Sequence, residues 1–170
     1  MDLMHLNEFF DYKNQLMEDI LTTDSIVKYL YEGNDYSIPA IDLAYTQVFP
    51  FEYIPDTITH GKTFICFDVD IQKASSRTFY NPIVYVWIFS HKSIMRLPEG
   101  GVRVDALASE IVKKINGSRM YGMGELDFYS SKRFVTMNDY IGKTLTFHAV
   151  DFNNPRPSNK QVPANRKRYS

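Results

Sequence analysis

Two neighbouring strand patterns in the middle of the sequence constrain the fold more than any other feature. Residues 62–72 alternate between two faces, with apolar side chains at 65, 67, 69 and 71 on one of them, which is the period of a β-strand. The next strand pattern, 79–90, contains an unbroken apolar run from Ile83 to Phe89. Such a run is typical of a strand that is covered on both faces. The polar segment between the two patterns predicts a turn, so we expect a β-hairpin whose second strand is central in a sheet.

Amphipathic helices are predicted on both sides of this hairpin. Apolar residues recur at helical spacing in residues 3–21, in a shorter segment that Thr23 or Asp24 caps and Gly33 ends, and in residues 102–116. Between the second helix and the hairpin, residues 45–54 are strand-like, but the segment contains Pro50 and is followed by Pro55. Proline cannot donate to a strand ladder, so this segment is expected to be an edge or irregular strand.

A second hairpin is predicted near the end of the folded region. Its strands are residues 125–135 and 142–152, joined by a turn near Asn138, Asp139 and Gly142. The alternation of the second strand slips after Ala149, which predicts a bulge there.

These elements together predict an α+β fold. It has a single antiparallel β-sheet, made of two hairpins plus an edge strand, with the N-terminal helices and one central helix packed on a face. The length of 170 residues fits one domain, placed at residues 1–152. Residues 153–170 hold three prolines and no apolar periodicity, so they are interpreted as an extended basic C-terminal tail.

Charge is distributed unevenly along the chain although its net value is only −1. Residues 1–40 contain eight acidic and two basic residues, whereas residues 154–170 contain five basic residues and no acidic one. An acidic front and a basic end favour head-to-tail contact between copies. The alternative is a solvated acidic helix face with an unrelated charged tail.

The single cysteine and the N-terminal sequence bear on the compartment. Cys66 excludes an intramolecular disulfide, and its place in an apolar strand predicts a buried, inert thiol. The N-terminus lacks the basic and apolar regions of a signal peptide, and the longest apolar run is too short to span a bilayer. We therefore expect synthesis in a cytoplasm and no membrane contact.

The search for catalytic chemistry yields one alternative, a metal-dependent nuclease. Asp68 and Asp70 share one strand face, and Asp56 follows a proline upstream. Hard cations are bound by such carboxylates. However, Lys73 lies three residues beyond Asp70, on the opposite face from a nuclease lysine. The histidines are scattered, at positions 5, 60, 91 and 148. We therefore predict no catalytic residue, metal or cofactor.

Two further segments suggest anion contact. The segment Glu99-Gly100-Gly101-Val102 precedes a helix but lacks the lysine and serine or threonine of a phosphate-binding loop, so a turn entering the helix is the preferred interpretation. The basic segment 165–169 has the charge for phosphate contact. We expect contact between subunits there, with DNA contact at most incidental.

Three stretches resemble a known family. They are Lys62-Thr63-Phe64-Ile65-Cys66-Phe67-Asp68-Val69-Asp70, Arg96-Leu97-Pro98-Glu99-Gly100-Gly101-Val102-Arg103-Val104-Asp105 and Asn116-Gly117-Ser118-Arg119-Met120-Tyr121-Gly122. These stretches resemble the sequences of small proteins encoded in the morphogenesis regions of tailed bacteriophages and prophages of Gram-positive bacteria. The similarity covers residues 3–152 and leaves the basic tail outside. The order of elements also resembles the tail-terminator and tail-completion class of neck proteins.

The resemblance implies a structural virion protein. It implies a homo-oligomeric ring, commonly a hexamer, at the head–tail junction, which completes or terminates the tail and joins it to the head. Partners would be the tail tube protein and a head-side connector or head completion protein, and assembly would take place in the bacterial host cytoplasm. A head-side connector or adaptor of the same particle is the alternative. The candidate interface residues are Ala74, Ser75, Ser76, Arg77, Thr78, Lys92, Arg96, Glu99, Arg156, Lys160, Arg166, Lys167 and Arg168.

Overall fold

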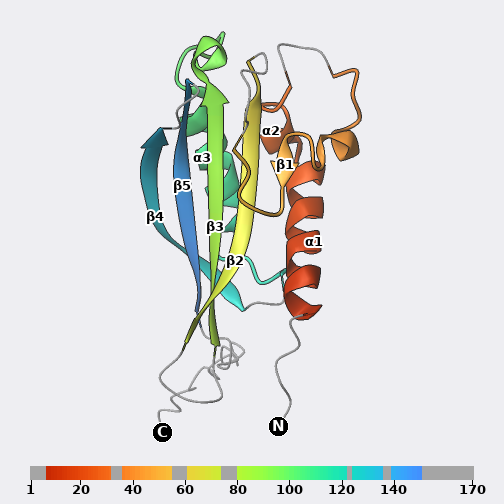
Figure 1. Cartoon of the computed structure of the whole chain (residues 1–170), viewed down its shortest axis with the longest axis vertical. Coiled ribbons are helices and arrows are strands. Elements are labelled where there is room, and N and C mark those ends of the chain that lie inside the picture. The colour runs from red at the N-terminus through yellow and green to blue at the C-terminus, as the bar shows by residue number, and fades with distance from the viewer. Residues whose placement is uncertain are drawn as a thin grey trace, which may run out of the picture.

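The computed structural model describes residues 7–31, 36–54, 61–73, 80–121, 124–135 and 139–150. Within these residues the chain has an α+β fold, with helices and a five-stranded sheet (Figure 1). In chain order the elements are α1 (Asn7–Thr22), α2 (Asp24–Val27), η1 (Ala40–Leu43), β1 (Val48–Phe49), β2 (Thr63–Lys73), β3 (Tyr80–His91), η2 (Lys92–Ile94), α3 (Arg103–Ile115), β4 (Glu125–Val135) and β5 (Tyr140–Val150). The predicted fold class and the predicted order of elements are confirmed.

The strands are arranged in the order β1-β2-β3-β5-β4. Strands β2 and β3 form the predicted hairpin, and β3 is the central strand, as its continuous apolar run indicated. The sheet differs from the prediction at one edge, because β1 pairs with β2 in parallel and is only two residues long. Pro50 ends β1 directly, which explains why the strand-like residues 45–54 form so little strand.

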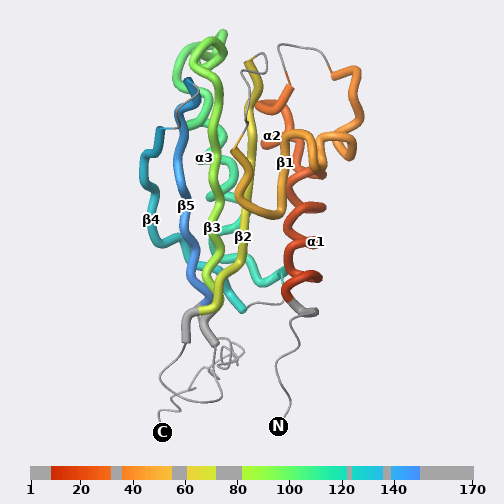
Figure 2. The backbone as a smooth tube through the Cα atoms, viewed as in Figure 1, coloured from red at the N-terminus to blue at the C-terminus, as the bar shows by residue number. Residues whose placement is uncertain are grey.

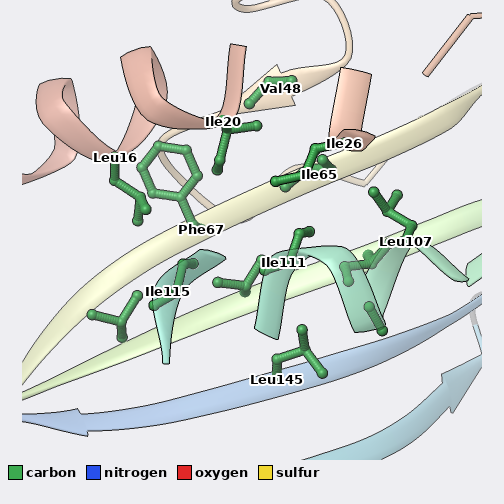
Figure 3. Close-up of a cluster of buried hydrophobic side chains, with 14 of the residues drawn as sticks. Leu16, Ile20, Ile26, Val48, Ile65, Phe67, Leu107, Ile111, Ile115 and Leu145 are labelled. Carbon is green, nitrogen blue, oxygen red and sulfur yellow. The ribbon is translucent and has the colours of Figure 1, made fainter. Parts of the chain in front are cut away.

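The main core lies between the helices and one face of the sheet. Leu16 and Ile20 of α1 meet Phe67 of β2, and Leu107 and Ile111 of α3 pack in the same cluster (Figure 3). All five side chains are almost completely buried. Burying such a side chain stabilises the fold by roughly 2 kcal/mol. The helices therefore cover one face of the sheet, as predicted.

Within the described part of the chain, the opposite face is covered at one end only, by aromatic side chains. After β1 the chain turns back across β2 (Figure 2), and the ring of Tyr53 stacks on that of Phe49 with centroids 4.1 Å apart. Phe64 stacks in turn on Phe89 at 5.2 Å, and Tyr140 packs edge-on against both. The high aromatic content of the sequence is thus used partly to build a second, smaller core.

Two details of the helices and hairpins differ from the sequence-based expectation. Thr23 does not cap α2 with its side chain, because its hydroxyl donates to the Asp19 carbonyl of α1 at 2.6 Å. The bulge lies in β4, between Phe128 and Ser130, and β5 pairs without interruption. The predicted bulge after Ala149 is not present in β5 up to Val150, and the residues beyond lie outside the described part of the chain.

Gly142 lies within β5, which begins two residues earlier than the predicted strand of residues 142–152. A Cβ atom at this position would lie 2.2 Å from the Ile88 carbonyl oxygen and 2.7 Å from the Cβ of Phe89. The ring of Phe134 occupies the space beside the glycine, 2.8 Å from where that Cβ would be. Glycine is therefore required here by the close approach of β3, β4 and β5.

We predict that Gly142→Ala lowers the free energy of unfolding by about 3 kcal/mol, because the added methyl group displaces backbone that cannot move freely. Urea denaturation followed by circular dichroism measures the change. Asp70→Ala, an exposed substitution in the same sheet, serves as the control and should change stability little. A Gly142→Ala variant as stable as the control would contradict this account of β5.

Candidate assembly surfaces

The loop that follows β3 carries three of the candidate interface residues, Lys92, Arg96 and Glu99. It lies at one end of the long axis of the molecule (Figure 1), and all three residues are exposed. Lys92 forms an ion pair of 2.8 Å with Asp139, the residue that precedes β5. Its hydrogen bond lowers the pKa of the Asp139 carboxyl. The loop is therefore attached to the neighbouring hairpin and presents charged side chains of both signs.

A tight turn leads from this loop into α3, as predicted. Arg96 and Val102 form an isolated antiparallel bridge, and the Gly100 N–H donates to the Leu97 carbonyl at 3.0 Å. Gly100 and Gly101 have φ angles of +100° and +95°, a region that glycine enters without steric cost. The two glycines thus allow the chain to reverse direction between Arg96 and Val102.

Arg103, the first residue of α3, fixes the loop to the helical layer. Its Nε donates to the Ile94 carbonyl at 2.9 Å, and its terminal nitrogen donates to the Tyr29 carbonyl at 3.0 Å. The side chain is buried, and burial lowers the pKa of its guanidinium, although Glu99 acts in the opposite direction. The buried guanidinium of Arg103 therefore joins the start of α3 to Tyr29, which lies 74 residues away in sequence.

The other candidate interface residues lie outside the described residues. These are the hairpin tip from Ala74 to Thr78 and the tail residues Arg156, Lys160, Arg166, Lys167 and Arg168. They stay predictions from the sequence.

The carboxylates of the nuclease alternative are not gathered into a metal-binding group in the described part of the chain. Asp68 forms an ion pair of 2.5 Å with Lys13 of α1, Asp70 is exposed, and Asp56 is outside the described residues. Among the described residues, no cluster of three or more histidine, cysteine or acidic side chains is placed to hold a metal ion.

Cys66 has the environment that the sequence predicted. Its side chain is completely buried beneath Tyr53, with the thiol 3.7 Å from the Tyr53 carbonyl. Burial raises the pKa of the thiol to about 12. Since the thiolate is the reactive form, the thiol is inert at neutral pH.

Beyond the aromatic cluster, no element of the described residues covers the far face of the sheet, which is partly aromatic. Tyr85 and Trp87 stack with centroids 5.9 Å apart on β3, and Tyr129 stacks on His148 at 4.1 Å across β4 and β5. His148 is therefore packed against a residue of the neighbouring strand. Tyr129 owes its position to the β4 bulge, which the sequence analysis did not predict.

Sequence reasoning missed an exposed apolar segment beside α2, residues 36–45. Tyr36, Ile38, Ile41 and Tyr45 each expose at least half of their surface. The segment is anchored by Tyr31, whose hydroxyl donates to the Ile38 carbonyl at 2.6 Å and whose ring packs edge-on against Tyr36. Four large apolar side chains in a stretch without helical or strand periodicity were the available signal. Exposed groups of this kind mark interaction surfaces.

Comparisons with known proteins agree with the fold. The family model YomW matches residues 23–149, so the chain belongs to the YomW family, which is phage-derived. The structure is similar to a chain in the virion of a native gene transfer agent particle, with 15% sequence identity and a TM-score of 0.50, over 81% of this chain and 91% of that chain. No curated protein matches the sequence. In the described residues, no helix has the length and apolar character to cross a membrane.

We predict that Arg103→Met destabilises the protein by about 3 kcal/mol, because the Tyr29 and Ile94 carbonyls lose a buried, charged donor. Urea denaturation gives the stability. Hydrogen exchange of the loop amides should accelerate as well, since Ile94 is released. Arg96→Met, at an exposed position of the same loop, is the control. Equal stability of the two variants would show that Arg103 does not hold the loop.

Proposed function

We propose that this protein is a structural component of a phage virion that forms a ring at the head–tail interface. In that role it completes or terminates the tail and joins it to the head. The observation that supports the proposal best is the shared fold with a chain of a gene transfer agent virion, over most of both chains. Membership of the phage-derived YomW family points in the same direction.

The distribution of exposed groups fits assembly better than catalysis. Exposed large apolar side chains are concentrated in the 36–45 segment and on β4, with others such as Phe10 and Met120 elsewhere on the surface, and charged loop residues lie at one end of the sheet. The Cys66 thiol is inert. Asp68, one of the carboxylates of the nuclease alternative, is paired with Lys13. A protein of this kind acts by geometry, since one surface of a ring complements the tail tube and another complements the head-side connector.

The first test is the solution mass measured by light scattering over a concentration series, with negative-stain images of large species. We expect a closed ring, with six copies as the expected number for a tail-side position. A ring of another copy number would favour a head-side adaptor. A monomer at every concentration, with no ring in the images, would count against the proposal.

The basic tail provides a second test of assembly. Deleting residues 154–170 should leave the circular dichroism spectrum unchanged and weaken ring formation, because five positive charges are removed. Sedimentation velocity measures the loss of large species. A control variant that keeps the length of the tail, with its five basic residues changed to glutamine, separates charge from chain length. Loss of the folded signal would instead make the tail part of the domain.

A further inference from the structure

The outer edge of β4 is closed by neighbouring chain in its first part only. The Leu126 N–H donates to the Ser118 carbonyl at 3.0 Å, and the Phe128 N–H donates to the Asn116 side-chain oxygen at 2.7 Å. The segment that follows α3 therefore satisfies the outward backbone groups at the start of the strand. The bulge comes directly after Phe128.

Beyond the bulge, the outer edge has no neighbour among the described residues. Leu126 and Phe128, whose backbone groups point outward, are paired with Ala149 and Phe147 of β5. In an antiparallel ladder, every second residue of β5 has a β4 partner whose backbone groups point outward in the same way. The outward backbone groups are then those of Ser131, Arg133 and Val135, whose partners are Leu145, Lys143 and Ile141. Among the described residues, no hydrogen bond reaches these three from outside the strand pair. An open edge of this kind is a ready contact surface.

The open edge is basic. Lys132 and Arg133 are both exposed, and neither forms an ion pair with any described residue. The neighbouring base on β5, Lys143, is different, because it is paired with Asp105 at 2.6 Å. Tyr129 and Val135 add apolar surface on either side, each with 67% of its surface exposed.

The opposite flank of the molecule is acidic. Helix α1 buries Tyr12, Leu16 and Ile20, and at 100° per residue the face directly opposite holds Asp11, Asn14 and Glu18. Neither Asp11 nor Glu18 forms an ion pair within the described part of the chain, and both are exposed. Phe10, with 68% of its surface exposed, supplies apolar area beside them.

These two flanks lie on opposite sides of the sheet. Helix α1 runs beside β2 at one side, and β4 forms the other side, with both elements following the long axis (Figures 1 and 2). Two different surfaces on opposite sides of one chain give heterologous contacts, which close into a ring when the rotation permits.

We propose that the contact between neighbouring copies joins the open β4 edge, residues 131–135, to the outer face of α1. The occupant of the β4 edge is a second copy of this chain, and Lys132 and Arg133 meet Asp11 and Glu18. This inference rests on the proposed ring and names its contact. The basic C-terminal tail is a poor occupant of the same edge, because its five positive charges would face two more.

Charge reversal on the full-length chain tests the contact. Lys132→Glu with Arg133→Glu, and separately Asp11→Lys with Glu18→Lys, should each raise the dissociation constant of the assembly at least about tenfold, because attraction becomes repulsion. The chain with all four changes should regain assembly, because the signs are opposite again. Asp70→Lys with Asp127→Lys is the matched control for the Asp11 and Glu18 variant, because it makes the same change in net charge at exposed positions of the sheet. Circular dichroism shows that each variant is folded, and sedimentation velocity gives the constants.

Mixing the two single-flank variants adds an independent measurement. Each variant alone repels itself, but alternating copies present opposite charges at every contact, so a ring with an even copy number should re-form. If both charge-reversal variants assembled as tightly as the wild type, or if the four-change variant did not recover assembly, this contact would be overturned while the virion role would stay in place. A wild-type chain that never associates would overturn the ring and the contact together.

Discussion

The packing of α1 and α3 on the same face of the sheet is the constraint on which the rest of the structure depends. These two helices and β2, β3 and β5 form one continuous apolar cluster. The far face is left with a smaller aromatic cluster at one end, built on Phe64 and Phe89. Because the helices occupy one side only, the remaining sheet face and the β4 edge stay accessible. The surfaces that suit assembly are thus a consequence of where the main core is built.

Buried polar side chains fix the irregular segments that the apolar core does not hold. The Gln47 amide donates to the Leu30 carbonyl at 2.7 Å and to the Thr63 carbonyl at 2.9 Å, which joins the end of the helical region to the edge of the sheet. Arg103 performs the same task at the start of α3, where it joins the Ile94 and Tyr29 carbonyls. A buried carbonyl without a hydrogen-bond partner destabilises the fold by more than a hydrogen bond to it stabilises the fold. These two residues therefore specify one arrangement of loops over the core.

Much of the fold follows from periodicity in the sequence, and the exceptions have physical causes. The alternation of residues 62–72 and the apolar run from Ile83 predicted β2 and the central β3, since strand pattern and burial coincide there. The parallel pairing of β1 was not predictable, because a two-residue strand carries no periodic signal. The bulge between Phe128 and Ser130 of β4 was not predicted, because β4 is mostly exposed and has no clean alternation in which an extra residue could be recognised.

The candidate assembly surfaces were less predictable, because they depend on which residues the fold brings to the outside. Sequence charge suggested an acidic front and a basic tail, and Asp11 and Glu18 do lie on an exposed helix face. Lys132 and Arg133 drew no attention in a strand of mixed composition. They gain importance only from the strand order, which puts β4 at the edge, and from the bulge, after which the outer backbone groups are open. A net charge of −1 hides this arrangement. Since the two charged flanks are separated by the width of a sheet, they cannot neutralise each other within one chain. Their attraction is available only to a neighbouring copy, which favours repeated head-to-tail contact over a symmetric pair.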